Sequence, residues 1–312
     1  MGELGQIVGE CSHRELPQLT GSGRSAAGVA LPSPREGRRP WWLWWNILSI
    51  DAPTVSVVWA LLFAECYGAK LSTAQMVALN LTIWTVYACD RLLDSWRSTS
   101  TKHLQERHVF YARHWIWMTC LVALSGSAAL LVSTDYLNAR EEAAGAKLGV
   151  IVCLYLLAIH IGGKRIGRIL PKELLVGALF AAGTTLPVWY SDTAGWRVWL
   201  AIALFALLCA LNCVSIESWE CEGSVEKMSR LVGWSKPRLD VLALALGMFS
   251  LLLVPAEFAK KPAAFLMLAI SLGSFLILLL NRCRQRFSRP ALRVLVDVAL
   301  VTAGLLALMA RI

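Results

Sequence analysis

The sequence predicts an all-α protein, a polytopic membrane helix bundle of about nine transmembrane helices. Hydrophobic residues make up 57% of the 312 residues, charged residues only 16%, and the mean hydropathy is +0.57. An ordinary soluble domain has about 25% charged residues. Apolar runs long enough to cross a bilayer recur along most of the chain, and a soluble protein of this size has too little interior to bury them.

Two regions differ in composition. Residues 1–40 are polar and rich in Gly, Ser, Pro and Arg, so we expect a disordered tail. Residues 41–312 are expected to form a single transmembrane domain, which begins with a Trp-rich stretch typical of a membrane interface. Most apolar runs contain about 18–21 residues, the length that a membrane-spanning helix needs. The predicted spans are 48–68, 73–93, 115–133, 146–163, 173–190, 196–216, 239–257, 262–281 and 291–310.

The loops carry an uneven distribution of positive charge. If the N-terminus is cytoplasmic, 23 of the 30 Lys and Arg residues lie on the cytoplasmic side and seven on the other. Such an excess is typical of cytoplasmic loops. It predicts an integral protein of the cell's inner or plasma membrane with its N-terminus in the cytoplasm and its C-terminus outside. It also explains most of the net charge of +9 without a nucleic-acid partner.

Two aspartates close the second predicted span. Asp90 and Asp94 are four residues apart, so their carboxylates lie on one face of a helix. Such a pair suits Mg²⁺, which takes one or two carboxylates and completes its shell with phosphate oxygens and water. The alternative is a solvated helix end at which Arg91 and Arg97 neutralise the carboxylates.

Two further clusters are expected on the same side of the membrane. Lys164 and Arg165 follow a pair of glycines after the fourth span. They could bind an anion there, or they could simply contribute to the positive charge of the cytoplasmic side. Glu217 and Glu220 share a helix face at the end of the sixth span, with Asn212 deeper in the apolar part. Together with the first aspartate pair, these clusters form a plausible cage for a Mg²⁺–diphosphate.

Two other polar residues and one charged stretch lie in or near apolar segments. Asp297 lies inside the last span, and a salt bridge to Arg293 one turn earlier is its expected role, with proton relay as the alternative. His160, near the end of the fourth span, is expected to be a hydrogen-bonded packing residue, with substrate contact as the alternative. The charged stretch 106–114 is either solvated surface or a cap over an active site.

The sequence resembles the UbiA-type intramembrane prenyltransferases over about residues 46–310. The family's first motif, Asn-Asp-x-x-Asp-x-x-x-Asp, falls on 86–94, where Asp90 and Asp94 match and the leading Asn-Asp pair is missing. Lys164-Arg165 matches the family's Lys-Arg after the fourth helix. Glutamates stand where the second motif has aspartates, so the chain resembles a divergent member.

The resemblance implies a Mg²⁺-dependent enzyme that moves an isoprenyl group from a prenyl diphosphate to a lipophilic acceptor, with its active site facing the cytoplasm. Asp90, Asp94, Glu217 and Glu220 would be the catalytic, metal-binding carboxylates. The residues expected to bind diphosphate are Lys164, Arg165, Arg97 and Asn212. The alternatives are a non-catalytic UbiA-like protein that binds isoprenoids or lipids, a membrane terpene cyclase, and a transporter.

Overall fold

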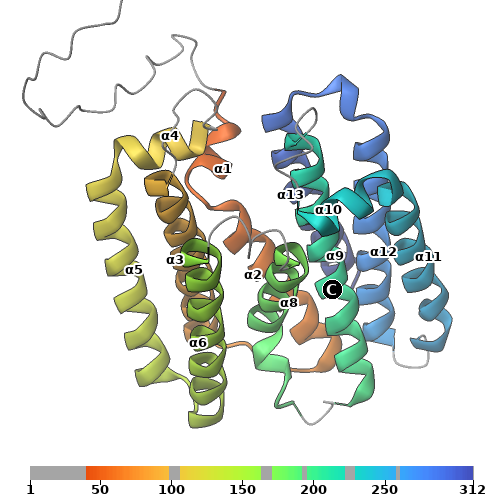
Figure 1. Cartoon of the computed structure of the whole chain (residues 1–312). Helices are drawn as coiled ribbons and strands as arrows, with labels where there is room; N and C mark the ends of the chain where they lie inside the picture. Colours follow the sequence, from red (N-terminus) through yellow and green to blue (C-terminus); the bar gives the residue numbers. More distant parts are fainter. Residues whose placement is uncertain are drawn as a thin grey trace, which may run out of the picture.

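The computed structural model describes residues 40–97, 106–162, 171–191, 195–221, 229–257 and 261–311. Every element in this part of the chain is helical (Figure 1). The first half contains α1 (Leu43–Ile47), α2 (Asp51–Tyr67), α3 (Thr73–Arg97), α4 (Glu106–Arg113), α5 (Trp115–Tyr136) and α6 (Ala139–Ile161). The second half contains α8 (Lys172–Thr185), η2 (Leu186–Val188), α9 (Trp196–Glu220), α10 (Arg230–Ser235), η4 (Lys236–Arg238), α11 (Leu239–Glu257), α12 (Lys261–Arg282), η6 (Arg284–Arg286) and α13 (Arg289–Arg311). The predicted tail lies outside the described residues.

Each of the nine predicted spans coincides with a helix. By length and hydropathy, six helical stretches of the described chain can cross a membrane: α5, α6, α9, α10 to α11, α12 and α13. α2 and α8 fall short because they contain 17 and 14 residues. α3 is long enough but carries polar side chains such as Gln75 and Asn80. The prediction of an all-α membrane bundle is confirmed, whereas the count of nine spans stays a prediction.

Local signals explain several helix ends. α6 begins seven residues before the predicted span because the Asn138 side chain accepts hydrogen bonds from the backbone N–H groups of Arg140 and Glu141. α2 ends at Gly68, whose φ of 67° is a left-handed conformation that glycine adopts freely. Ser49 has a φ of 60° at the turn between α1 and α2. Its buried hydroxyl contacts the Tyr111 hydroxyl at 2.7 Å, which ties this turn to α4.

The centre of the bundle is formed by α2, α9, α12 and α13, which pack against one another. Trp59 of α2 stacks on Phe205 of α9 with ring centroids 4.4 Å apart, and its indole N–H donates to the Leu300 carbonyl of α13 at 3.2 Å. α8 crosses α9 closely, since a Cβ on Gly177 would lie 2.6 Å from the backbone nitrogen of Ala210. These contacts fix the helices that carry the site described below.

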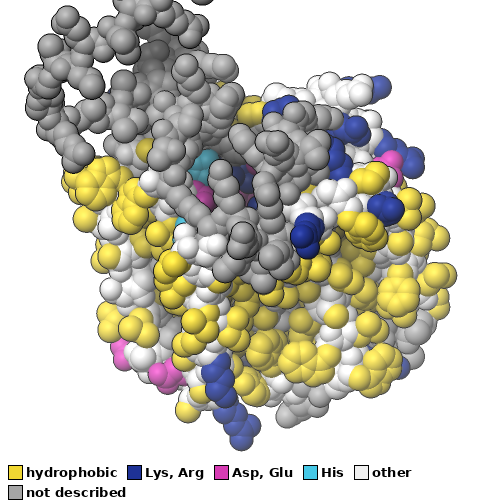
Figure 2. Space-filling view, in the orientation of Figure 1, with side chains coloured by type: hydrophobic (Ala, Val, Ile, Leu, Met, Phe, Trp, Pro, Cys, Tyr) yellow, Lys and Arg dark blue, Asp and Glu magenta, His cyan; other side chains and the backbone are white. Residues whose placement is uncertain are grey.

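The outer surface of the bundle is strongly apolar. Only 17% of the apolar window of α5 and 6% of that of α6 is buried inside the protein. Figure 2 shows hydrophobic side chains covering the flank of the molecule, with Lys and Arg gathered mainly near its upper rim. A soluble protein rarely exposes so large an apolar surface, so this flank is suited to contact lipid.

Candidate active site

A cavity of about 420 Å³ opens at one end of the bundle. Its polar wall comes from the ends of helices that meet there: α3 and α9 end at this level, and α2, α8 and α13 begin there. Its deeper wall is largely apolar and includes Val55, Tyr87, Phe180 and Leu300. A cavity with charged groups at one end and an apolar interior suits an amphiphilic ligand.

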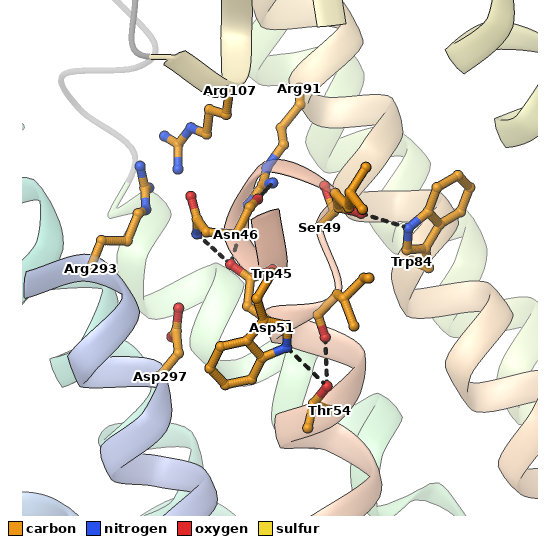
Figure 3. A network of polar contacts seen from close by, with 12 residues as sticks. Trp45, Asn46, Ser49, Asp51, Thr54, Trp84, Arg91, Arg107, Arg293 and Asp297 are labelled. Atoms are coloured by element: carbon orange, nitrogen blue, oxygen red, sulfur yellow. Dashed lines mark hydrogen bonds and ion pairs between the residues drawn. The ribbon is translucent and has the colours of Figure 1, made fainter. Parts of the chain in front are cut away.

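Three arginines from three helices line the polar end of the cavity. Arg91 of α3, Arg107 of α4 and Arg293 of α13 direct their side chains toward the same region (Figure 3). Arg91 is buried, donates to the backbone carbonyl of Asn46 and lies 3.4 Å from Asp51 Oδ2. Asn46 also donates to that aspartate oxygen, so the α1–α2 turn holds Arg91 in place.

Arg107 differs from the other two arginines because it has no carboxylate partner among the described residues. Its Nε donates to His108 Nε2 at 3.2 Å. Burial and the neighbouring Arg107 and Arg91 lower the pKa of His108 to about 3, so this imidazole is neutral and brings no compensating charge. Burial and Arg91 also lower the pKa of Arg107 to about 10. At neutral pH the cavity therefore holds a destabilised guanidinium that an anion would stabilise.

Asp90 and Asp94 lie on one face of α3, as predicted. His160 of α6 approaches both carboxylates, with Nε2 3.8 Å from Asp90 Oδ1 and 3.5 Å from Asp94 Oδ1. The two carboxylates are 44% and 50% exposed. Asp90 lines the cavity and Asp94 lies just beyond its lining. His160 also packs through Nδ1 against the Leu156 carbonyl at 2.9 Å, which agrees with the predicted hydrogen-bonded role.

Glu217 and Glu220 also line the cavity, but each is paired with a cation. Lys172 Nζ lies 2.6 Å from Glu217 Oε2, and Arg293 Nη1 donates to Glu220 Oε1 at 2.7 Å. Arg293 therefore pairs with α9, whereas the sequence suggested a salt bridge to Asp297. The role of Glu217 and Glu220 as metal ligands stays a prediction. It would require each glutamate to release its cationic partner and bind the metal instead.

Asn212 lies deeper, where its Nδ2 donates to Asp297 Oδ1 at 3.0 Å. The diphosphate role predicted for Asn212 is not favoured by this contact, because its amide N–H is directed to a carboxylate. Lys164, Arg165 and the Arg97 side chain lie outside the described part of the chain. Sequence reasoning did not single out Asn46 or Asp51 as parts of a site, because their partner Arg91 is distant in sequence. Arg107 lies in the stretch 106–114, for which the sequence allows a solvated surface or a cap over an active site.

The donor set at Asp90 and Asp94 fits Mg²⁺. Within the described ranges, no three His, Cys, Asp or Glu side chains are grouped as a metal site. Mg²⁺ does not require such a cage, since two carboxylates suffice when phosphate oxygens and water supply the other ligands. The half-exposed carboxylates of Asp90 and Asp94 leave room for those ligands.

Comparison with known proteins gives one informative likeness. No family model and no curated protein matches the sequence. The apo structure of a UbiA homolog from Aeropyrum pernix K1 is similar in fold, with a TM-score of 0.57 and 16% sequence identity over 84% of this chain and 98% of that chain. The chain has a UbiA-type fold. The sequence-based resemblance to this fold is thereby confirmed.

Together with the apolar helices, this likeness supports an integral membrane protein with a UbiA-type helix bundle. A likeness at 16% identity concerns the fold alone. The chemistry of this UbiA-type bundle must therefore be argued from its own side chains.

Proposed function

We propose that the protein is a membrane prenyltransferase that transfers an isoprenyl group from a prenyl diphosphate to a lipophilic acceptor. The observation that carries this proposal is the Arg107 guanidinium, which lines the cavity of a UbiA-type bundle beside Arg91 and has no carboxylate partner among the described residues. A diphosphate would pair with this guanidinium, and an isoprenyl tail matches the apolar interior of the cavity.

The arginine cluster would bind and orient the diphosphate. Arg107 would donate its free N–H groups, and Arg91 is held beside it by Asp51 and Asn46. Arg293, which pairs with Glu220, lines the same end of the cavity. Hydrogen bonds between guanidinium groups and phosphate are charge-assisted and directional, so the cluster fixes the leaving group as negative charge develops on it.

Asp90 and Asp94 would hold Mg²⁺, as their exposure and spacing permit. When bound, Mg²⁺ would neutralise charge on the departing diphosphate. Glu217 and Glu220 would instead position Lys172 and Arg293 through their ion pairs. In this proposal the two acidic clusters have different roles, one toward the metal and one toward the cationic side chains.

The apolar part of the cavity would hold the isoprenyl chain. Tyr87 and Phe180 approach one another there with ring centroids 6.5 Å apart, and Val55 and Leu300 complete the wall. These side chains exclude water from the reacting carbon, which favours transfer to an acceptor over hydrolysis. The distribution of Lys and Arg supports a cytoplasmic N-terminus, an external C-terminus and a cavity that opens toward the cytoplasm.

The test is diphosphate release by the full-length protein in detergent, with geranyl, farnesyl or geranylgeranyl diphosphate and a panel of phenolic acceptors. We expect release that needs Mg²⁺, stops with EDTA and falls at least about a hundredfold in Asp90→Asn, because loss of one Mg²⁺ carboxylate removes several kcal/mol of charge stabilisation. Asp240→Asn is the matched control, since this carboxylate pairs with Arg282 outside the cavity. Full activity in Asp90→Asn would refute the metal assignment, and Mg²⁺-dependent binding without release would favour a non-catalytic isoprenoid-binding protein.

A further inference from the structure

The deep part of the cavity contains a polar pair that the proposed diphosphate chemistry does not use. Asp297 of α13 is only 9% exposed and accepts a hydrogen bond from Asn212 of α9 at 3.0 Å. Both side chains line the cavity among apolar neighbours such as Leu300 and Val55. Polar groups are expensive in such surroundings and tend to mark a functional site.

The polar atoms left over in this region are hydrogen-bond acceptors. Asn212 Oδ1 is buried and has no hydrogen-bond partner among the described residues. Asp51 Oδ1 of α2, which also lines the cavity, is buried and unpartnered in the same way. Figure 3 shows Asp51 and Asp297 on neighbouring helices, below the arginine cluster. Because buried polar atoms are nearly always paired, these acceptors indicate a ligand that brings donors.

The position of the pair relates it to the transfer reaction. Asp297 follows Arg293 by four residues, so it lies about one helical turn of 5.4 Å deeper along α13. A group bound by Asp297 and Asn212 would lie beside the bond between the prenyl carbon and a diphosphate held by the arginines. An acceptor must occupy this place for the transfer to proceed.

We propose that Asp297 and Asn212 bind the head group of the acceptor, and that this head group is an uncharged hydroxyl, as in a phenol or alcohol. The inference rests on the proposed prenyl transfer and specifies its second substrate. A hydroxyl can donate its one proton to Asn212 Oδ1 and so satisfy this unpartnered acceptor. A carboxylate in the same place would bring no donor to the unpartnered oxygens of Asn212 and Asp51, so we expect aromatic acids to bind this subsite less tightly.

The experiment measures equilibrium binding of three aromatic probes to the full-length protein in detergent: naphthol, methoxynaphthalene and naphthoate. We expect naphthol to bind at least about tenfold more tightly than the other two, because only naphthol can donate a hydrogen bond to the buried acceptor. Asp297→Leu and Asn212→Leu should abolish this preference. Asp240→Asn should retain it, because Asp240 lies outside the cavity lining.

Binding of farnesyl diphosphate is measured on the same samples and separates the outcomes. Loss of the naphthol preference with retained farnesyl diphosphate binding supports the subsite. If Asp297→Leu loses both ligands, the same comparison is made with Asp297→Asn, which replaces the carboxyl group by an amide of the same size. Equal binding of the three probes by the wild type, or an unchanged preference in both Asn212→Leu and Asp297→Asn, overturns the subsite. Naphthol-selective binding without any farnesyl diphosphate binding would refute the proposed transfer while the hydroxyl subsite stands.

Discussion

Replacement of Arg107 by methionine should raise stability and weaken ligand binding at once. The folded protein lowers the pKa of Arg107 from its ordinary 12.5 to about 10 through burial and the nearby Arg91. At about 1.4 kcal/mol per pH unit, the folded state carries a penalty of at most about 3.5 kcal/mol for this charge. Because the folded-state pKa is the lower one, the penalty is fully present below about pH 10 and therefore at neutral pH.

The two effects of Arg107→Met have opposite signs. Methionine retains much of the apolar stem and removes the charge, so the ligand-free protein should gain about 1–2 kcal/mol after some loss of packing. A hydrogen bond to a charged group contributes about 1.5–3 kcal/mol, so affinity for farnesyl diphosphate should fall roughly 10- to 150-fold.

The assay combines thermal unfolding without ligand and equilibrium binding of farnesyl diphosphate in detergent. Arg113→Met is the matched control, because Arg113 lies on the same short helix but is exposed, and neither quantity should change. A less stable Arg107→Met protein, or one with wild-type affinity, would refute the reasoning that Arg107 is a buried cation that an anionic ligand stabilises.

Three further predictions concern the rest of the site and its support. Asp94→Asn should weaken the Mg²⁺ dependence of farnesyl diphosphate binding, measured by titrating Mg²⁺, because it removes one of two available carboxylates; an unchanged Mg²⁺ titration would remove Asp94 from the metal site. Lys172→Met should lower stability by about 1–3 kcal/mol because it leaves Glu217 partly buried without its cation, and adding Glu217→Gln should restore most of that loss in thermal unfolding; additive losses would contradict the pairing. Gly177→Ala should lower the midpoint of thermal unfolding because its Cβ meets the α9 backbone, whereas Gly149→Ala, which has open space around it, should not; equal effects of the two would show that the close helix crossing is not needed.

The positions of the helices could be predicted from the sequence because membrane-spanning length is a strong local constraint. Every predicted apolar run coincides with a helix, and the apolar surface of α5 and α6 follows from composition. The early start of α6 depends on a cap at Asn138, which lies outside the apolar run. A hydropathy pattern therefore locates a helix but does not fix its polar end.

The site was predicted only where its members share one helix. Asp90 and Asp94 lie together because four-residue spacing places them on one face. Glu217 pairs with Lys172, which lies on a different helix. The spacing of residues along the sequence does not predict such a contact between helices. Arg107 lies in the charged stretch 106–114, for which the sequence allows either a solvated surface or a cap over the site. The position of Arg107 beside Arg91 in the structure favours the cap.

The central claim is that the arginine-lined cavity binds a prenyl diphosphate, and competition binding tests it most directly. Labelled farnesyl diphosphate would be titrated into the wild-type protein with Mg²⁺ or with EDTA, then displaced by inorganic diphosphate or by farnesol. The account predicts binding that needs Mg²⁺ and displacement by inorganic diphosphate, because the arginines recognise the anion, with farnesol a weaker competitor. Binding that is indifferent to Mg²⁺ and displaced equally well by farnesol, or no binding of any prenyl diphosphate, would contradict it.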